Sequence, residues 1–310
     1  MLPSDYSNNK LNKSNKLGKS NQLNNSSKSN KFGTDLTPNF ERLVWKSRNG
    51  NFSDLPTSAK RFIYLLVPGL FCNNFGIKYM QDNIEHLQQL RLDVRKMDIN
   101  TGGSVEENAE AIKDYIMRES RYHNKKDSNK KHSNKKFIII GHSKGGVDAG
   151  TAIAKYNLYS YVEALIILQS PWKGTLIADG SAKYFTNVLS FVSKINKDAM
   201  RVLSHEERYK TLSNYPLDIH QVKTISFTST IGDKKSLLYY IPDAIISRQY
   251  NTQSDGVLIP EDGIIPGSDY VHVDGLAHNE SVILMGSRDD TNKLYPGDIT
   301  YALIVLSLIK

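Results

Sequence analysis

The stretch that decides the fold is IIIGHSKGGVD at residues 138–148, where three isoleucines lead directly into a glycine-rich turn. An apolar run followed by Gly-His-Ser-Lys-Gly-Gly predicts a buried strand, a sharp turn and a helix. Glycines on both sides of Ser143 let strand and helix approach closely, because no Cβ stands between them. The pattern therefore indicates either a serine presented for nucleophilic attack or an ordinary tight turn.

The glycines and Lys144 of this stretch also suggest a phosphate-binding loop. Such a loop needs four residues between its first glycine and a Gly-Lys-Ser or Gly-Lys-Thr triplet. That spacing is absent here. We therefore set the phosphate loop aside.

Strand-length runs alternate with helical patterns on both sides of the turn. The expected strands are 61–67, 92–99, 136–140, 162–168, 222–230 and 269–274, and the expected helices are 77–91, 104–117, 145–157 and 301–309. This alternation predicts parallel strands with connecting helices. The fold class is therefore α/β, with a mostly parallel open sheet flanked by helices.

The long interval between two of these strands, about 176–220, also has helical character. Its apolar residues fall at helical spacing from Tyr184 to Ile195. They predict either an amphipathic helix packed on the core or a helical lid over an acyl-binding pocket.

The net charge of +8 comes from two low-complexity segments. Residues 1–32 hold eight Asn, seven Ser and six Lys, and residues 121–136 hold seven Lys or Arg. The rest of the chain has 27 basic and 30 acidic residues. Composition therefore predicts a disordered tail at 1–32, a domain at 33–310 and a low-complexity surface loop at 122–136. No nucleic-acid-binding motif accompanies these lysines, so we expect no nucleic-acid partner.

A single cysteine, Cys72, excludes an internal disulfide, which suits a reducing compartment. Its simplest role is that of a small buried side chain. No apolar stretch reaches the roughly 18–20 residues of a membrane span. The N-terminus lacks an apolar signal-peptide core and is Ser-rich without an Arg before Arg42. We expect an intracellular, cytoplasmic location, with organelle targeting left open.

A nucleophilic serine in such a fold needs a base, and His278 is the best candidate. It lies in GLAHNESV (275–282), immediately after the last expected strand, and so follows the serine in the chain order of this arrangement. His272 lies within the alternating VHV and is better explained as a strand residue. His142 precedes Ser143, and we expect it to point away from the chemistry.

The acid that orients the base is expected between the serine and His278. Asp255 lies in a turn within TQSDGVLIP (252–260), after a strand-rich region. Asp233 and Asp274 also lie near strand ends, so both remain alternatives.

Backbone amides are the candidates for stabilising negative charge on a substrate oxygen. The amide of Lys144 follows Ser143 at the start of a helix. The first apolar strand ends in VPGLFCNNFG (67–76), where Leu70 follows Pro68-Gly69 and offers a second amide. A plain β-turn is the alternative for this loop.

Together these motifs resemble the α/β-hydrolase superfamily, in particular bacterial triacylglycerol lipases and related plant and protist hydrolases. The resemblance covers residues 61–310. It lies in VPGLF, GHSKGG, QSPWKGT (169–175), SDGV and LAHNES. It implies an α/β-hydrolase fold with a helical lid insertion at about 176–220, in which Ser143, Asp255 and His278 form a catalytic triad and the Leu70 and Lys144 amides form an oxyanion hole.

The chain departs from this family in one loop, where Pro68-Gly69 replaces the usual His-Gly. Some relatives also hold calcium near positions equivalent to Asp233 and Glu280. Neither context is diagnostic, so we expect no metal and no cofactor.

The resemblance implies a serine hydrolase that cleaves lipophilic acyl esters through an acyl-enzyme. An acyltransferase would use the same residues, and a non-catalytic scaffold protein with this fold is the alternative outside enzymes. A lipophilic ester is the expected partner, with weak membrane-surface contact through the lid or the basic segments. The oligomeric state stays open.

Overall fold

The computed structural model describes residues 32–70, 72, 79–126, 135–179, 200–232, 246–247, 251–286, 288 and 293–309. Contacts within the chain group Phe32–Lys310 as one compact unit. Several predictions lie outside the described residues: the tail at 1–31, most of the loop at 127–134, the centre of the expected lid at 180–199, and Asp233.

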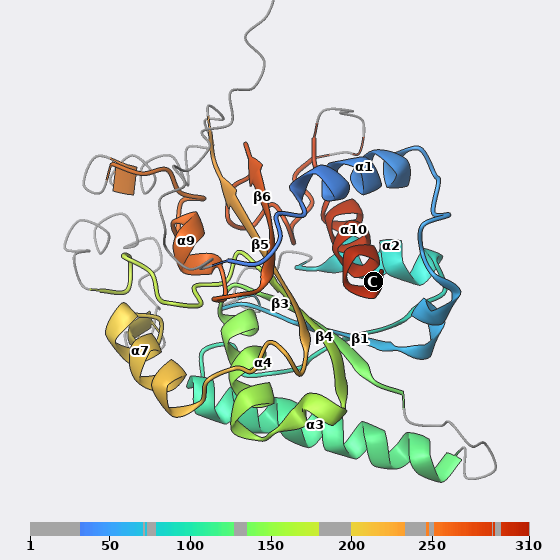
Figure 1. Ribbon diagram of the computed structural model, residues 1–310, viewed down its shortest axis with the longest axis horizontal. Helices are drawn as coiled ribbons and strands as arrows, with labels where there is room; N and C mark the ends of the chain where they lie inside the picture. Colours follow the sequence, from blue (N-terminus) through green and yellow to red (C-terminus); the bar gives the residue numbers. More distant parts are fainter. Residues whose placement is uncertain are drawn as a thin grey trace, which may run out of the picture. The chain divides into compact units, whose positions relative to one another are not determined.

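Six parallel strands form one sheet in the order β2-β1-β3-β4-β5-β6 (Figure 1). They are β1 (Ile63–Val67), β2 (Asp93–Lys96), β3 (Phe137–His142), β4 (Val162–Leu168), β5 (Lys223–Thr230) and β6 (Asp269–Asp274). Every neighbouring pair is parallel. This confirms the predicted open parallel sheet, with β3 and β4 at its centre.

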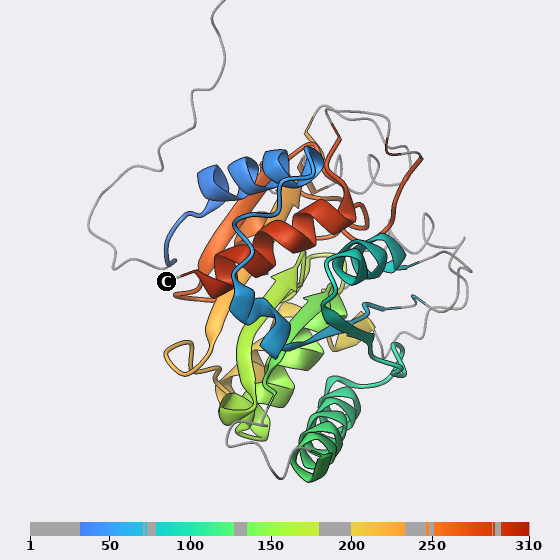
Figure 2. The same ribbon diagram turned by 90° about the vertical axis from the view of Figure 1, so that its right-hand side faces the viewer.

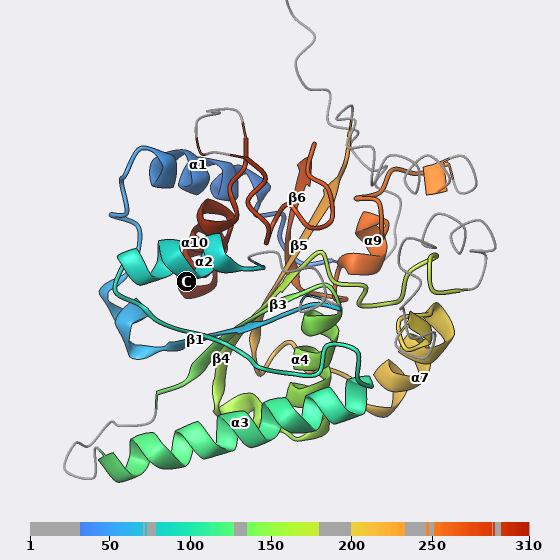
Figure 3. The same ribbon diagram turned by 180° about the vertical axis from the view of Figure 1, so that it is seen from behind.

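Helices cover both faces of this sheet (Figures 1 and 2). One face carries α1 (Thr37–Arg48), α2 (Gln81–Gln89) and α10 (Pro296–Leu308), and the other carries α3 (Val105–Lys126) and α4 (Lys144–Lys155). Side chains of a strand alternate between faces, so β3 supplies Ile138 and Ile140 to one core and Ile139 to the other. The view from behind shows α3 running along one side of the molecule (Figure 3).

The short elements are η1 (Thr57–Arg61), η3 (Leu158–Ser160), α7 (His205–Asn214) and α9 (Pro260–Gly263). Of the helices that the structure describes, none is both long enough and apolar enough to span a bilayer.

Helix α3 confirms one expectation and corrects another. Its capping box is present, since Glu107 Oε2 accepts from the Ser104 amide at 2.9 Å and Ser104 Oγ accepts from the Glu107 amide at 3.1 Å. However, the helix continues to Lys126, so the surface loop predicted at 122–136 begins later than expected. Arginine and lysine are good helix formers, and the helix therefore extends beyond its apolar face.

Helix α7 lies in the segment expected to form a lid, of which the structure describes residues 176–179 and 200–220. His205, in its first turn, contacts two carboxylates: its Nδ1 lies 2.6 Å from Asp179 Oδ2 and its Nε2 lies 3.0 Å from Asp262 Oδ2. One imidazolium thus joins α7 to the end of the preceding loop and to α9. The hydrogen bonds to the Asp262 and Asp179 carboxylates raise the pKa of His205 to about 9.

This arrangement predicts a loss of stability at alkaline pH. Below the ordinary pKa of 6.5, His205 is protonated in the folded and the unfolded chain, and its ion pairs contribute fully. Between pH 6.5 and about 9 the unfolded chain releases the proton first, so this contribution fades as pH rises. His205→Gln should flatten that part of the curve of unfolding free energy against pH, measured by urea titration. His220→Gln, at an exposed position, is the control and should leave the slope unchanged.

Two buried tyrosines give a second prediction, because only one has a hydrogen-bond partner. Tyr64 Oη donates to the Ala59 carbonyl at 2.8 Å, whereas the buried Tyr301 hydroxyl has no partner among the described residues. Tyr64→Phe should lower the free energy of unfolding by about 1 kcal/mol. Tyr301→Phe should leave it unchanged or raise it by up to about 1 kcal/mol, since it removes an unpaired polar group. Equal losses in both variants, measured by urea unfolding, would contradict this.

Candidate active site

Ser143 occupies a strained turn between β3 and α4. Its backbone angles, φ 52° and ψ −127°, lie outside the regions that a side chain normally allows. The flanking glycines leave no space for a Cβ: one on Gly141 would lie 2.5 Å from Gly146 Cα, and one on Gly145 would lie 2.3 Å from the Val67 carbonyl oxygen. The glycine pattern of the sequence is thus explained by close packing around a serine held in one orientation.

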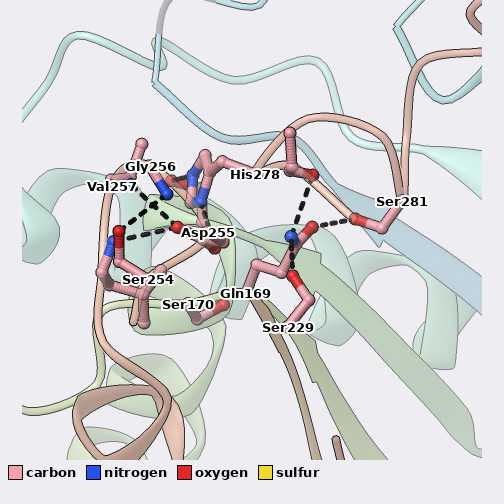
Figure 4. Close-up of polar contacts among 12 residues, drawn as sticks. Gln169, Ser170, Ser229, Ser254, Asp255, Gly256, Val257, His278 and Ser281 are labelled. Atoms are coloured by element: carbon pink, nitrogen blue, oxygen red, sulfur yellow. Dashed lines mark hydrogen bonds and ion pairs between the residues drawn. The ribbon is translucent and has the colours of Figure 1, made fainter. Parts of the chain in front are cut away.

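The structure brings together the three side chains selected from the sequence. His278 Nε2 lies 3.0 Å from Ser143 Oγ. On the other side of the ring, His278 Nδ1 lies 2.9 Å from Asp255 Oδ2 (Figure 4). All three residues are buried. A carboxylate can only accept, so the hydrogen of a neutral His278 lies on Nδ1 and leaves Nε2 to accept from the serine hydroxyl. The series Ser143–His278–Asp255 therefore has the polarity that proton abstraction from the serine requires.

A tight turn fixes Asp255 in front of His278. Its Oδ1 accepts from the amides of Val257 at 2.8 Å and Leu258 at 2.9 Å, which leaves Oδ2 for the imidazole (Figure 4). The His278 amide also donates to the Asp255 carbonyl at 2.9 Å. Asp255 and His278 are thus joined by main chain as well as side chain, which fixes their relative position.

Asp274, one of the two alternative acids, lies elsewhere in the described structure. It accepts a hydrogen bond from Thr230 Oγ1 at 2.5 Å and lies 3.5 Å from His272 Nε2 at the end of β6. His272 is a strand residue, as predicted.

His142 differs from the expectation that it points away from the chemistry. Its ring lies 5.0 Å from that of His278, centroid to centroid, and its Nε2 lies 2.8 Å from the His278 carbonyl oxygen. Burial, and then the nearby His278 charge, lower the pKa of His142 well below its ordinary value of 6.5. Its position before Ser143 gave no indication of this contact, which depends on a loop 136 residues later in the chain.

The two candidate oxyanion amides lie on segments packed against Ser143. A Cβ on Gly69 would lie 2.9 Å from Ser143 Cβ, so the loop that carries Leu70 touches the serine directly. Within the described residues, neither the Leu70 nor the Lys144 amide donates a hydrogen bond to another group. The Lys144 side chain is turned away along α4, where its Nζ pairs with Asp148 Oδ2 at 2.8 Å.

Gln169 is a buried residue near the site that the sequence analysis did not single out for a role. It follows β4 with a left-handed φ of 46°. Its Nε2 donates to Ser229 Oγ at 2.6 Å and to the Ala277 carbonyl at 3.1 Å, and its Oε1 accepts from Ser281 Oγ at 2.5 Å (Figure 4). The side-chain amide thus joins the end of β5 to the loop that carries His278.

The described residues contain no group of three or more His, Cys, Asp or Glu side chains that could hold a metal ion. Glu280, considered for calcium, instead accepts from the Ala277 amide through Oε2 at 2.8 Å. Cys72 is buried, as predicted, and burial raises the pKa of its thiol.

The contacts of Gln169 predict a large loss of stability on truncation. Gln169→Leu would leave the Ser229 and Ser281 hydroxyls and a buried carbonyl without this partner, and should lower the free energy of unfolding by about 3 kcal/mol in urea titration. Gln88→Leu, at an exposed position, should change it by less than about 0.5 kcal/mol. Gln169→Gly relieves the positive φ but also removes the amide; a gain in stability there would show that backbone strain, and not the amide, dominates.

The sequence of this chain matches one known protein family. Residues 77–254, more than half of the chain, match the family model of the PGAP1-like alpha/beta domain. No curated protein sequence matches the chain.

Three of the solved structures that resemble this chain are described as a carboxyl esterase, a lipase and a phospholipase. A metagenomic carboxyl esterase, MGS0156, aligns over 89% of this chain and 92% of its own, with 16% identity and a TM-score of 0.68. The Bacillus licheniformis lipase BlEst2 aligns over 72% and 86%, with 19% identity and a TM-score of 0.59. The phospholipase PlaB from Legionella pneumophila aligns over 79% and 60%, with 16% identity and a TM-score of 0.57. At these identities the likeness establishes the α/β-hydrolase fold. The family match shows that the chain belongs to the PGAP1-like alpha/beta domain family.

Proposed function

We propose that this protein is a serine hydrolase that cleaves carboxylic esters with lipophilic acyl groups through an acyl-enzyme. The observation that carries the proposal is the unbroken series of hydrogen bonds from Ser143 Oγ through His278 to Asp255. It is supported by the strained turn that presents the serine, and by the fold shared with esterases and lipases.

In the proposed acylation step, Ser143 Oγ attacks the ester carbonyl carbon while His278 Nε2 accepts the hydroxyl proton. Asp255 keeps the hydrogen of Nδ1 directed toward itself and stabilises the imidazolium that forms. The tetrahedral intermediate collapses when the C–O bond to the alcohol breaks and His278 returns the proton to the departing oxygen. Water then repeats the sequence on the acyl-enzyme, releasing the carboxylic acid and restoring the Ser143 hydroxyl.

The oxyanion of this intermediate would be held by the Leu70 and Lys144 amides. Lys144 begins α4, so its amide carries the positive end of the helix dipole. Donors of this kind act without reorganisation, because packing has already oriented them.

The preference for a lipophilic acyl group is supported by a small apolar cluster near the serine, separate from the two large cores. It comprises Leu70, Val105, Val147, Ala178, Val202 and Leu203. Ala178 and Val202 lie on either side of residues 180–199, which belong to the segment that we propose as a lid. An acyl chain on Ser143 would meet apolar surface here, which favours fatty acyl esters over small polar ones.

The test is labelling with a fluorophosphonate probe followed by peptide mapping. We expect an adduct on Ser143 in the wild type and none in Ser143→Ala, with ester hydrolysis reduced by about 10⁴-fold or more in that variant. Asp255→Asn should retain the fold and lose about 10⁴-fold in kcat, because the imidazole adopts the wrong tautomer.

Two matched variants serve as controls. Ser120→Ala removes another buried serine, on α3, and Asp274→Asn removes the alternative acid at the end of β6. Both should label and hydrolyse like the wild type. A folded wild type without an adduct on Ser143 would reject the proposal, and acyl transfer to an added alcohol faster than hydrolysis would identify an acyltransferase instead.

A further inference from the structure

A buried pair of aromatic side chains lies between the loop after β1 and the loop that carries His278. Tyr79 and His142 pack edge to face, with their ring centroids 5.6 Å apart and their planes at 71°. The Tyr79 hydroxyl is bonded to His142 Nδ1 and accepts from the Gly69 amide at 3.1 Å. On its other side, His142 Nε2 lies 2.8 Å from the His278 carbonyl oxygen.

These contacts form a series of hydrogen bonds, Gly69–Tyr79–His142–His278. The direction of each bond follows from the groups at the two ends of the series. A carbonyl oxygen only accepts, so His142 carries its hydrogen on Nε2 and donates it to His278. A neutral imidazole then has an acceptor at Nδ1, to which the Tyr79 hydroxyl donates. The Tyr79 oxygen keeps a lone pair for the Gly69 amide hydrogen. Burial keeps His142 neutral, since it lowers the pKa of His142 well below 6.5.

Both ends of this series lie at groups that the proposed reaction uses. At one end, Gly69 packs on Ser143 and precedes Leu70, whose amide is a candidate oxyanion donor. At the other end, the accepting carbonyl belongs to His278 itself. His142 also adjoins Ser143 in the chain, so the series connects the Gly69 loop, the Ser143 turn and the His278 loop.

The described part of the Gly69 loop is held by packing against the Ser143 turn and by the Gly69 amide, which donates to the Tyr79 hydroxyl. Proline at position 68 has no amide hydrogen to donate. Tyr79, in contrast, is anchored from a second direction, because Lys96 at the end of β2 donates to its carbonyl at 3.2 Å and lies 5.7 Å from its ring centroid. The tyrosine is therefore a fixed point from which the loop can be positioned.

We propose that Tyr79 and His142 are positioning residues, which hold the Leu70 amide and the His278 imidazole in their places relative to Ser143. This inference rests on the proposed function, because it assigns the pair a task in that reaction. A pair that served only the packing of the core would affect stability and leave the rate of the chemical step unchanged.

Three substitutions distinguish the contact from His142 to Tyr79 and Gly69 from the contact from His142 to His278. Tyr79→Phe keeps the ring and removes the hydroxyl, which releases the Gly69 amide. His142→Gln can place an amide donor near the position of Nε2 and loses the acceptor for Tyr79. His142→Asn does the reverse: it offers an acceptor near Nδ1 and loses the donor to His278.

The measurements are kcat and KM for p-nitrophenyl butyrate across a pH series, with fluorophosphonate labelling of Ser143. Loss of one direct oxyanion donor costs about 10²–10³-fold in kcat, so a displaced one should cost about 10–100-fold. We expect that loss in Tyr79→Phe and His142→Gln, with KM within about twofold of the wild type. His142→Asn should retain more of kcat and shift the acid limb of the pH–rate profile, because the contact to His278 is the one it loses.

The double variant Tyr79→Phe/His142→Gln should be no worse than the poorer single variant, since both cut the same series. Tyr64→Phe, which removes a buried tyrosine hydroxyl near the opposite end of β1, controls for loss of stability and should keep wild-type kcat. Wild-type kcat in Tyr79→Phe, or a fully additive double variant, would overturn the positioning role while Ser143 still labels. A wild type that neither labels nor hydrolyses would overturn the proposed function, and this inference with it.

Discussion

The close approach of β3 and α4 around Ser143 is the constraint on which the rest of the site depends. Gly141 packs against Gly146 of α4 and Gly145 packs against the main chain at the end of β1, with no space for a Cβ at either position. These contacts keep Ser143 in backbone angles that an unconstrained residue would leave. Local strain of this kind persists only where the surroundings over-determine it. Here the two large cores on either side of the sheet provide that support, since β3 contributes buried isoleucines to both.

Around this turn, both side chains and main-chain groups hold Asp255 and His278 in position relative to Ser143. The Asp255 turn is closed by two backbone amides that donate to the Asp255 carboxylate, and it is joined to the His278 loop by one backbone and one side-chain hydrogen bond. The side chains of Gln169 and of the Tyr79–His142 pair reach across strands and add to the backbone hydrogen bonds there, such as the one from the Leu276 amide to the Thr230 carbonyl. These cross-strand contacts are made by uncharged groups, and this limits the desolvation cost of placing them in the interior.

The strands, and Ser143, Asp255 and His278, could be predicted from the sequence because each lies in a short, recognisable sequence pattern. Strands 162–168 and 269–274 match the structure residue for residue. Helix α1 was missed, although Phe40, Leu43, Val44 and Ser47 recur at helical spacing and Pro38 marks its start. The roles of His142 and Gln169 could not be predicted, since their partners lie between 60 and 136 residues further along the chain. Contacts of that range follow from the order of strands in the sheet, which periodicity alone does not specify.

The distance in sequence between Ser143 and His278 has a consequence for synthesis and folding. Ser143 follows a central strand, whereas its partner His278 is 135 residues further on and follows β6 at the sheet edge. During synthesis, β3, Ser143 and α4 leave the ribosome well before His278 has been made. Contacts of such long range also form late during folding, because closing a long loop is entropically costly. An incomplete or partly folded chain therefore contains Ser143 without His278, so the hydrogen bond between the two forms only when the last strand has joined the sheet.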